Sequence, residues 1–429
     1  MSPGKNLKRS LLTSQMGETP SSSSSYSSSS AASSAAAEPG QLFAARVAAS
    51  AAAGAAAAAA DGAAEPRPSL QAQLQRGSRL VLALLRALGS PLKALAHFRC
   101  GAAVDELLAL PPRHRDTGWV QAQLGRACYE SAKYPRARQA FEEMRRVAPE
   151  RVEGLEVYSS VLWHLRLHSD LVHLAQTALA FDRSAPQTWC VMANAVSAQR
   201  DHTRALLYLK RALQLDPACV YALSLRGHEL VAINDLDGAA EAFREATRVN
   251  PRHYNAWYGL GTVFFKQQRH AAAESHFRQA SAIHGSSAVL LCYLGLSLAA
   301  QELHAAAAEV LRRACALDRG SAQARFQLAG VYTALGNHEA ARLELLAVHE
   351  DRPREVAVLV ALGRACKKVG RTDDAIKYLN LALEAASAGP GMHPALPALG
   401  KRRPATELNR IREELARVGS ADEEAESEW

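Results

Sequence analysis

Small and large apolar residues recur along this chain at a fixed interval of 34 residues. When residues 118–389 are divided into eight contiguous windows of 34, the eighth position of every window holds a small residue. The twentieth position is alanine in every window except at Leu171, and the twenty-fourth is a large apolar residue in every window except at Ala175. Position 32 is proline in four windows, where it cannot continue a helix interior. Each window is therefore predicted to form two helices that approach closely at their small residues.

This period predicts an all-α fold. A helix-turn-helix unit of 34 residues with small residues at these positions is typical of the tetratricopeptide repeat. Residues 118–389 are therefore predicted to form eight such repeats, stacked into a superhelix (an α-solenoid). In such a stack the first helix of each repeat lines a concave groove, which is where we expect a ligand to bind.

The segment that precedes the eight repeats predicts one further, degraded repeat. Within residues 79–117, Leu80–Phe98 and Gly101–Leu110 are expected to form its two helices. Pro91 stands where the small residue belongs, so we expect the first of these helices to be kinked or broken. Residues 1–78 are rich in serine and alanine, with few large apolar side chains, and are interpreted as a disordered low-complexity arm.

Three short segments follow the last repeat. We predict a loop over residues 390–404, an amphipathic helix over 405–419 that caps the stack, and an acidic tail over 420–429. The basic cluster Lys401–Arg403 is interpreted as solvated surface and not as a nuclear signal.

Composition narrows the function classes. Of the 429 residues, 48 % are hydrophobic but only 6 % are aromatic, which favours closely packed helices over sheets. The net charge of +8 is spread along the chain, so we expect no nucleic-acid partner. The seven cysteines show no CxxC spacing and are expected to be free thiols in a reducing compartment. The most apolar run, Leu80–Leu88, contains Arg86 and is too short to cross a bilayer, so no membrane partner is expected.

No catalytic motif is found in the sequence. Nucleotide-binding glycine loops, HExxH and GxSxG are all absent, and the repeats occupy the whole of residues 118–389. His164, His168 and His173 have irregular spacing and are interpreted as ordinary histidines, not as metal ligands. The sequence therefore predicts a protein that is not an enzyme and holds neither a metal nor a cofactor.

Repeat positions 2, 5, 9, 12 and 13 are predicted to point into the groove. They carry amides, aromatic rings and charges of both signs, a mixture that suits an extended peptide better than a nucleic acid. A ligand arginine would pair with Glu229, and a terminal carboxylate with Lys266 or an asparagine amide. The alternative for each residue is ordinary surface or packing between repeats. The candidate set is Asn194, His228, Glu229, Asn255, Tyr258, Phe265 and Lys266.

Several runs resemble the family of anaphase-promoting complex subunit 3, the cell division cycle 27 homologues. The most specific is Asn250–Gly261, NPRHYNAWYGLG; others are Thr117–Val120, Arg151–Tyr158 and Leu290–Cys292. The likeness covers about residues 80–380. It implies a scaffold subunit of a multisubunit cullin-RING ubiquitin ligase that promotes mitotic progression in nucleus and cytoplasm, alongside the other subunits of the complex.

The resemblance also implies a ligand and an oligomeric state. The family's carboxy-terminal repeats bind the Ile-Arg tails of coactivators, a role that transfers to the seven candidate groove residues. Family members form homodimers through an amino-terminal block of repeats. This chain begins within what resembles the serine-rich insert that follows that block, so homodimerisation stays open.

Other classes of helical-repeat protein fit the sequence less well. A co-chaperone module needs lysine and asparagine at groove positions of adjacent repeats, where this chain has Cys190, Ser224 and Gly259. The repeat half of a glycosyltransferase needs several hundred further catalytic residues. A sister repeat subunit of the same ligase, or another peptide-binding repeat adaptor, remains as the alternative.

Overall fold

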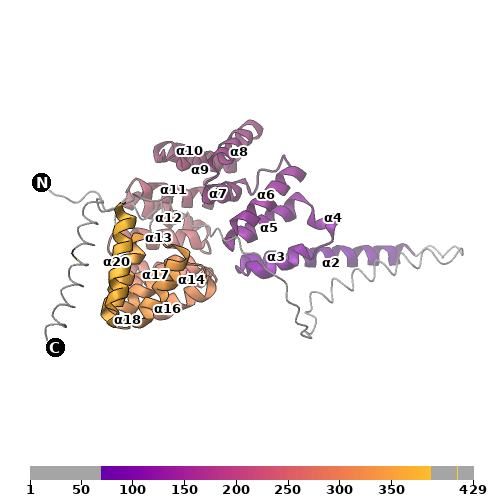
Figure 1. The fold of residues 1–429 in the computed structure, drawn as a ribbon. Helices are drawn as coiled ribbons and strands as arrows, with labels where there is room; N and C mark the ends of the chain where they lie inside the picture. The colour runs from indigo at the N-terminus through magenta and orange to yellow at the C-terminus, as the bar shows by residue number, and fades with distance from the viewer. Residues whose placement is uncertain (1–68, 388–412, 414–429) are drawn as a thin grey trace, which may run out of the picture. The chain divides into compact units, whose positions relative to one another are not determined.

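A computed structural model describes residues 69–387 and residue 413 of the chain, and every regular element in these ranges is a helix (Figure 1). The prediction of an all-α repeat fold is confirmed. The described chain divides into two compact units at Leu162/Trp163. The predicted loop, the predicted acidic tail and residues 1–68 of the predicted arm lie outside the described residues, as does the predicted capping helix apart from residue 413.

The first unit comprises residues 69–162. Its helices are α2 (Leu70–Ala96), α3 (Cys100–Leu108), α4 (Pro112–Arg115), α5 (Gly118–Glu130), α6 (Tyr134–Val147) and most of α7 (Leu155–His164). Helix α2 packs against α3, α3 packs against α5, and α5 pairs with α6.

Helix α2 differs from prediction at two points. It begins at Leu70, so residues 70–78 are helical and not part of a disordered arm. It also runs through Pro91 as one continuous helix, so the predicted break at this residue is wrong. Proline removes one backbone hydrogen bond. The residues that follow it, Ala94 and Leu95, are buried against Ala103 and Ala127, and this packing holds the last turns of the helix in place.

The second unit comprises residues 163–387. Its helices are α8 (His168–Phe181), α9 (Pro186–Ala198), α10 (His202–Leu215), α11 (Val220–Ala232), α12 (Leu236–Val249), α13 (Tyr254–Lys266), α14 (His270–Ile283), α15 (Ala288–Ala299), α16 (His304–Leu317), α17 (Ala322–Ala334), α18 (His338–Asp351), α19 (Val356–Val369) and α20 (Thr372–Ser387). From α9 onward each odd-numbered helix pairs with the next helix, and that helix packs against the following pair.

The small residues of the repeat lie where helices touch. The ring of Phe243 is fully buried between α11, α12 and α13. A Cβ atom on Gly227 would lie 2.6 Å from that ring, and one on Gly259 would also collide with it. Glycine is needed at both positions because the large residue at position 24 fills the space between two repeats.

A recurrent turn separates the two helices of a repeat. Its residue at position 15 has a left-handed backbone, as in Ala132, Arg200 and Gln268. The N–H group of the next residue donates to the carbonyl at position 11, for example Arg269 to Phe264 at 2.9 Å. This is the Schellman arrangement, which ends a helix and satisfies its last carbonyl groups. The second helix then begins at position 17 of the frame.

Candidate functional site

The first helices of neighbouring repeats contact one another in the second unit, and their common surface is called the helix A face here. Helix α11 contacts both α9 and α13, and α15 contacts α17. All seven candidate residues lie on α9, α11 or α13. They therefore occupy three adjacent repeats of one compact unit.

Asn194 connects α9 with α11. Its side-chain amide Nδ2 donates a 2.8 Å hydrogen bond to the hydroxyl oxygen of Tyr221. Asn194 is buried, so this bond lies between the two helices and is not on an open surface. Its place matches the predicted alternative of packing between repeats.

Glu229 is also held between two repeats. The residue is only 4 % exposed. Oε1 accepts a hydrogen bond from Ser197 Oγ at 2.7 Å, and His202 Nδ1 donates to Oε2 over 2.7 Å. A carboxylate offers about four acceptor sites, and these two bonds use two of them. The predicted site did not include Ser197 and His202.

An aromatic cluster lies beside this network. The ring of His228 meets that of Phe243 edge-on at 5.0 Å, and Tyr258 meets Tyr293 edge-on at 5.3 Å. A side-chain hydrogen bond joins the two tyrosines. Tyr258 also contacts Phe277 at 5.9 Å. Such offset and edge-on pairs are favourable arrangements of rings. Tyr293 is a further member that the sequence prediction missed.

Burial sets the charge state of this cluster. Desolvation, aided by the neighbouring His253, lowers the pKa of His228 to about 4, so its ring is neutral at pH 7. Desolvation also raises the pKa of Tyr258 well above its usual range. The Nε2 atom of His228 is buried and has no hydrogen-bond partner among the described residues. A buried polar atom of this kind is a candidate ligand contact.

The remaining three candidates are spread along α13. Asn255 is half-buried in the first turn, whereas Phe265 and Lys266 end the helix. The Phe265 ring meets that of His270 edge-on at 5.1 Å, and Lys266 is only 7 % exposed. At 1.5 Å per residue, Asn255 and Lys266 are about 16 Å apart. The structure therefore does not bring these two residues together around a single carboxylate.

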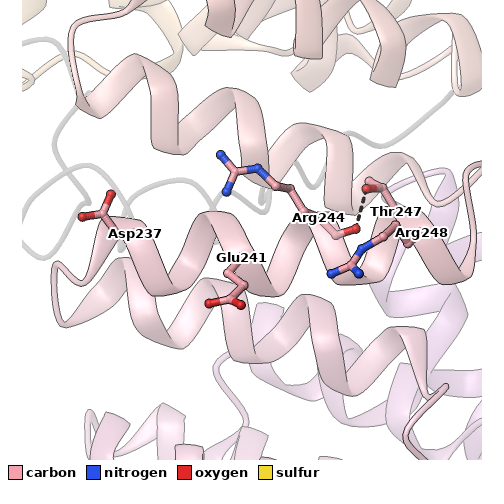
Figure 2. Close-up of a pocket in the computed structure, with 5 residues that line it drawn as sticks. All are labelled: Asp237, Glu241, Arg244, Thr247 and Arg248. Carbon is pink, nitrogen blue, oxygen red and sulfur yellow. Dashed lines mark hydrogen bonds between the residues drawn. The ribbon is translucent and has the colours of Figure 1, made fainter.

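A hollow of about 570 Å³ lies elsewhere, on the surface of α12 (Figure 2). It is lined by Asp237, Glu241, Arg244, Thr247 and Arg248, with the Thr247 hydroxyl donating to the Arg244 carbonyl at 2.9 Å. Its two acids and two bases favour no single ligand charge. It contains none of the seven predicted residues.

The part of the chain that the structure describes offers neither a metal-binding cluster nor a membrane-spanning helix. Within it, no group of three or more His, Cys, Asp or Glu side chains is placed to hold a metal ion. Nor does any helix there have both the length and the apolar character needed to span a membrane.

Comparison with known proteins shows which proteins this chain resembles. Models described as "Tetratricopeptide repeat" match residues 224–288 and 358–391. Anaphase-promoting complex subunit 3 of Schizosaccharomyces pombe is 36 % identical over 302 residues, which cover 70 % of this chain and 45 % of the relative. The chain has the tetratricopeptide repeat fold and is similar in sequence to anaphase-promoting complex subunit 3.

Other relatives agree with this similarity to subunit 3. Cell division cycle protein 27 homolog B of Arabidopsis thaliana is 37 % identical over 304 residues, covering 71 % of this chain and 41 % of the relative. Protein bimA of Emericella nidulans is 44 % identical over 212 residues, which cover 49 % of this chain and 26 % of the relative. The chain therefore spans less than half the length of the curated subunit 3 relatives that it matches.

A solved structure supports the fold alone. The crystal structure of the APC/C hetero-tetramer Cut9-Hcn1 aligns with a TM-score of 0.59 and 15 % identity, over 72 % of this chain and 58 % of that one. The similarity to subunit 3 rests on the sequence relatives.

Proposed function

We propose that this chain is a non-catalytic scaffold subunit of the anaphase-promoting complex ubiquitin ligase, where it contacts other subunits and promotes mitotic progression in the nucleus and cytoplasm. The observation that carries the proposal is the similarity to subunit 3 proteins at 36–37 % identity over about 70 % of this chain. The stacked repeats support a scaffold because each repeat contacts only its neighbours and leaves long faces for partners. The proposed function needs no cofactor.

The ligand that we assign to the helix A face is the Ile-Arg tail of a coactivator. The apolar isoleucine would pack on the Tyr258 and Tyr293 rings, and the neutral His228 Nε2 would bond the tail backbone. The arginine would use the two acceptor sites that remain on Glu229. Asn255, half-buried at the start of α13, would take the terminal carboxylate.

Lys266 lies too far along α13 to share that carboxylate with Asn255. Its proposed role is to add positive charge at the far end of the helix, next to Phe265. Asn194 would position Tyr221 through their hydrogen bond. A few contacts to a flexible tail predict a micromolar dissociation constant, about −7 to −8 kcal/mol, because ordering the tail offsets much of the gain.

The test is a fluorescence-anisotropy titration of the full chain with a labelled peptide that ends in Ile-Arg. We expect micromolar binding that falls at least tenfold when the peptide carboxylate is amidated, or in Asn255→Ala. Gln323→Ala is the matched control, because Gln323 holds the same repeat position on α17 and is also half-buried. Tight binding of the amidated peptide, or equal loss in both variants, would contradict the site. No binding by a chain that is helical by circular dichroism would contradict the ligand.

A further inference from the structure

The amino-terminal half of α2 extends beyond the repeat that it belongs to. Helix α3 begins at position 17 of a window that starts at residue 84, so residues 70–83 precede the frame. They add about 20 Å of helix. Helix α3 is only nine residues long, and Figure 1 shows α2 continuing past it. Every residue from Ser69 to Leu82 is exposed.

The exposed extension carries large apolar side chains. Leu70, Leu74, Val81 and Leu85 are 57–74 % exposed. At 100° per residue they fall within about 60° of the helix circumference, as one continuous stripe. Leu80 and Leu82, more than half exposed, lie on either side and widen the apolar arc to roughly 200°. Monomeric proteins rarely leave so many neighbouring leucines in water unless a partner covers them.

The charge of α2 has one sign. Arg76, Arg79, Arg86 and Lys93 lie on the side opposite the apolar stripe, and residues 70–96 contain no aspartate or glutamate. A second copy of this helix would bring like charges together, whereas an acidic partner would complement them. Residues 70–96 also lack tryptophan, tyrosine and phenylalanine, the side chains that anchor helices at a membrane surface.

We propose that α2 is a docking helix that inserts its amino-terminal half into an apolar groove of an acidic protein. Helix-in-groove recognition uses an apolar stripe as anchors and wraps more than one side of the helix, as the broad arc on α2 requires. Basic side chains opposite the stripe would meet carboxylates at the groove rim. This site is independent of the helix A face, which belongs to the second unit.

The experiment uses the full chain and calcium-loaded calmodulin, an acidic protein with apolar helix-binding grooves, as a probe of this chemistry. We expect micromolar or tighter binding by calorimetry. Binding should fall at least tenfold in the stripe variant Leu74→Asp/Val81→Asp and in the charge variant Arg76→Glu/Arg79→Glu. Leu207→Asp on α10 is the control, because Leu207 is 61 % exposed and lies outside α2.

The following outcomes would overturn the proposal that α2 is a docking helix. Absence of calmodulin binding, or binding that both α2 variants retain, shows that α2 is no docking helix of this class. Sedimentation with phosphatidylserine vesicles without calmodulin binding assigns α2 to a membrane surface. A dimer by light scattering that the stripe variant abolishes assigns it to a second copy. None of these readouts depends on Ile-Arg binding, so the two proposals fail separately.

Discussion

The contact between Gly259 and Phe243 provides a sharp test of how adjacent repeats pack. A Cβ atom on Gly259 would collide with the fully buried Phe243 ring. Overpacking of this kind costs about 1–3 kcal/mol, and alanine gains about 1 kcal/mol over glycine inside a helix. Gly259→Ala is therefore expected to destabilise the protein by about 0–2 kcal/mol. Gly330 provides the comparison, since a Cβ there meets nothing within 4 Å and Gly330→Ala should stabilise by about 1 kcal/mol.

Urea unfolding followed by far-ultraviolet circular dichroism measures both variants. In a Phe243→Leu background the collision disappears, so Gly259→Ala should become stabilising by up to about 1 kcal/mol. The double-mutant cycle should then give a coupling of about 1–3 kcal/mol between positions 243 and 259. Equal shifts for Gly259→Ala and Gly330→Ala, or a coupling near zero, would refute this account of the packing between repeats.

Three further results are expected. Glu229→Ala should lower the free energy of unfolding by about 1–3 kcal/mol, because Ser197 and His202 lose a buried acceptor; urea denaturation should show Glu229→Gln to be milder. Since the folded pKa of His228 is about 4, below the ordinary 6.5, the unfolded chain takes up its proton first. Stability should be greatest above pH 6.5 and fall by up to about 3 kcal/mol toward pH 4, and His228→Phe should flatten that profile in denaturation measured against pH. Burial raises the pKa of the Cys100 thiol to about 11, so mass spectrometry at pH 8 should show alkylation at least tenfold slower in the folded than in the urea-unfolded protein.

Much of the repeat geometry could be predicted from the sequence, because close packing between neighbouring helices restricts the size of the residue at particular repeat positions. The small residue at position 8 and the large one at position 24 are buried in contact, as Gly227 and Phe243 illustrate. Position 7 of this repeat ordinarily takes an apolar residue, and Arg226 is an exception. The structure gives the reason: Arg226 Nη2 donates to Glu245 Oε2 at 2.8 Å across the helix pair, so a charged pair replaces an apolar contact.

The extension of α2 was not predicted because it carries no repeat signature. Residues 70–79 contain leucine, glutamine and arginine, which favour helix formation individually, so local propensity was the available signal. This helix propensity was given less weight than the low complexity of the segment that precedes residue 70. Helix α7 differs in the opposite direction and begins late, at Leu155, because Gly154 adopts a φ of +96° just before it.

The candidate site was predicted less completely than the fold. A frame position identifies the helix face but not how far neighbouring repeats close over it, so it did not decide between an open groove and packing between repeats for Asn194 and Lys266, which are both buried. The partners of Glu229 are Ser197 and His202, 32 and 27 residues earlier. These separations are near one repeat length. Pairs of polar residues at about that spacing were the sequence signal that would have identified Ser197 and His202 as partners of Glu229.

The left-handed turn residues have a consequence for how this scaffold can change. Ala132, Arg200 and Gln268 hold a backbone conformation that strains an L-residue, while Gly336 and Gly370 adopt it freely. All three strained residues are exposed and project from the turns. A glycine at any of them would relieve strain without altering the helix A face. The residues that close these turns are therefore separate from the residues that form the helix A face.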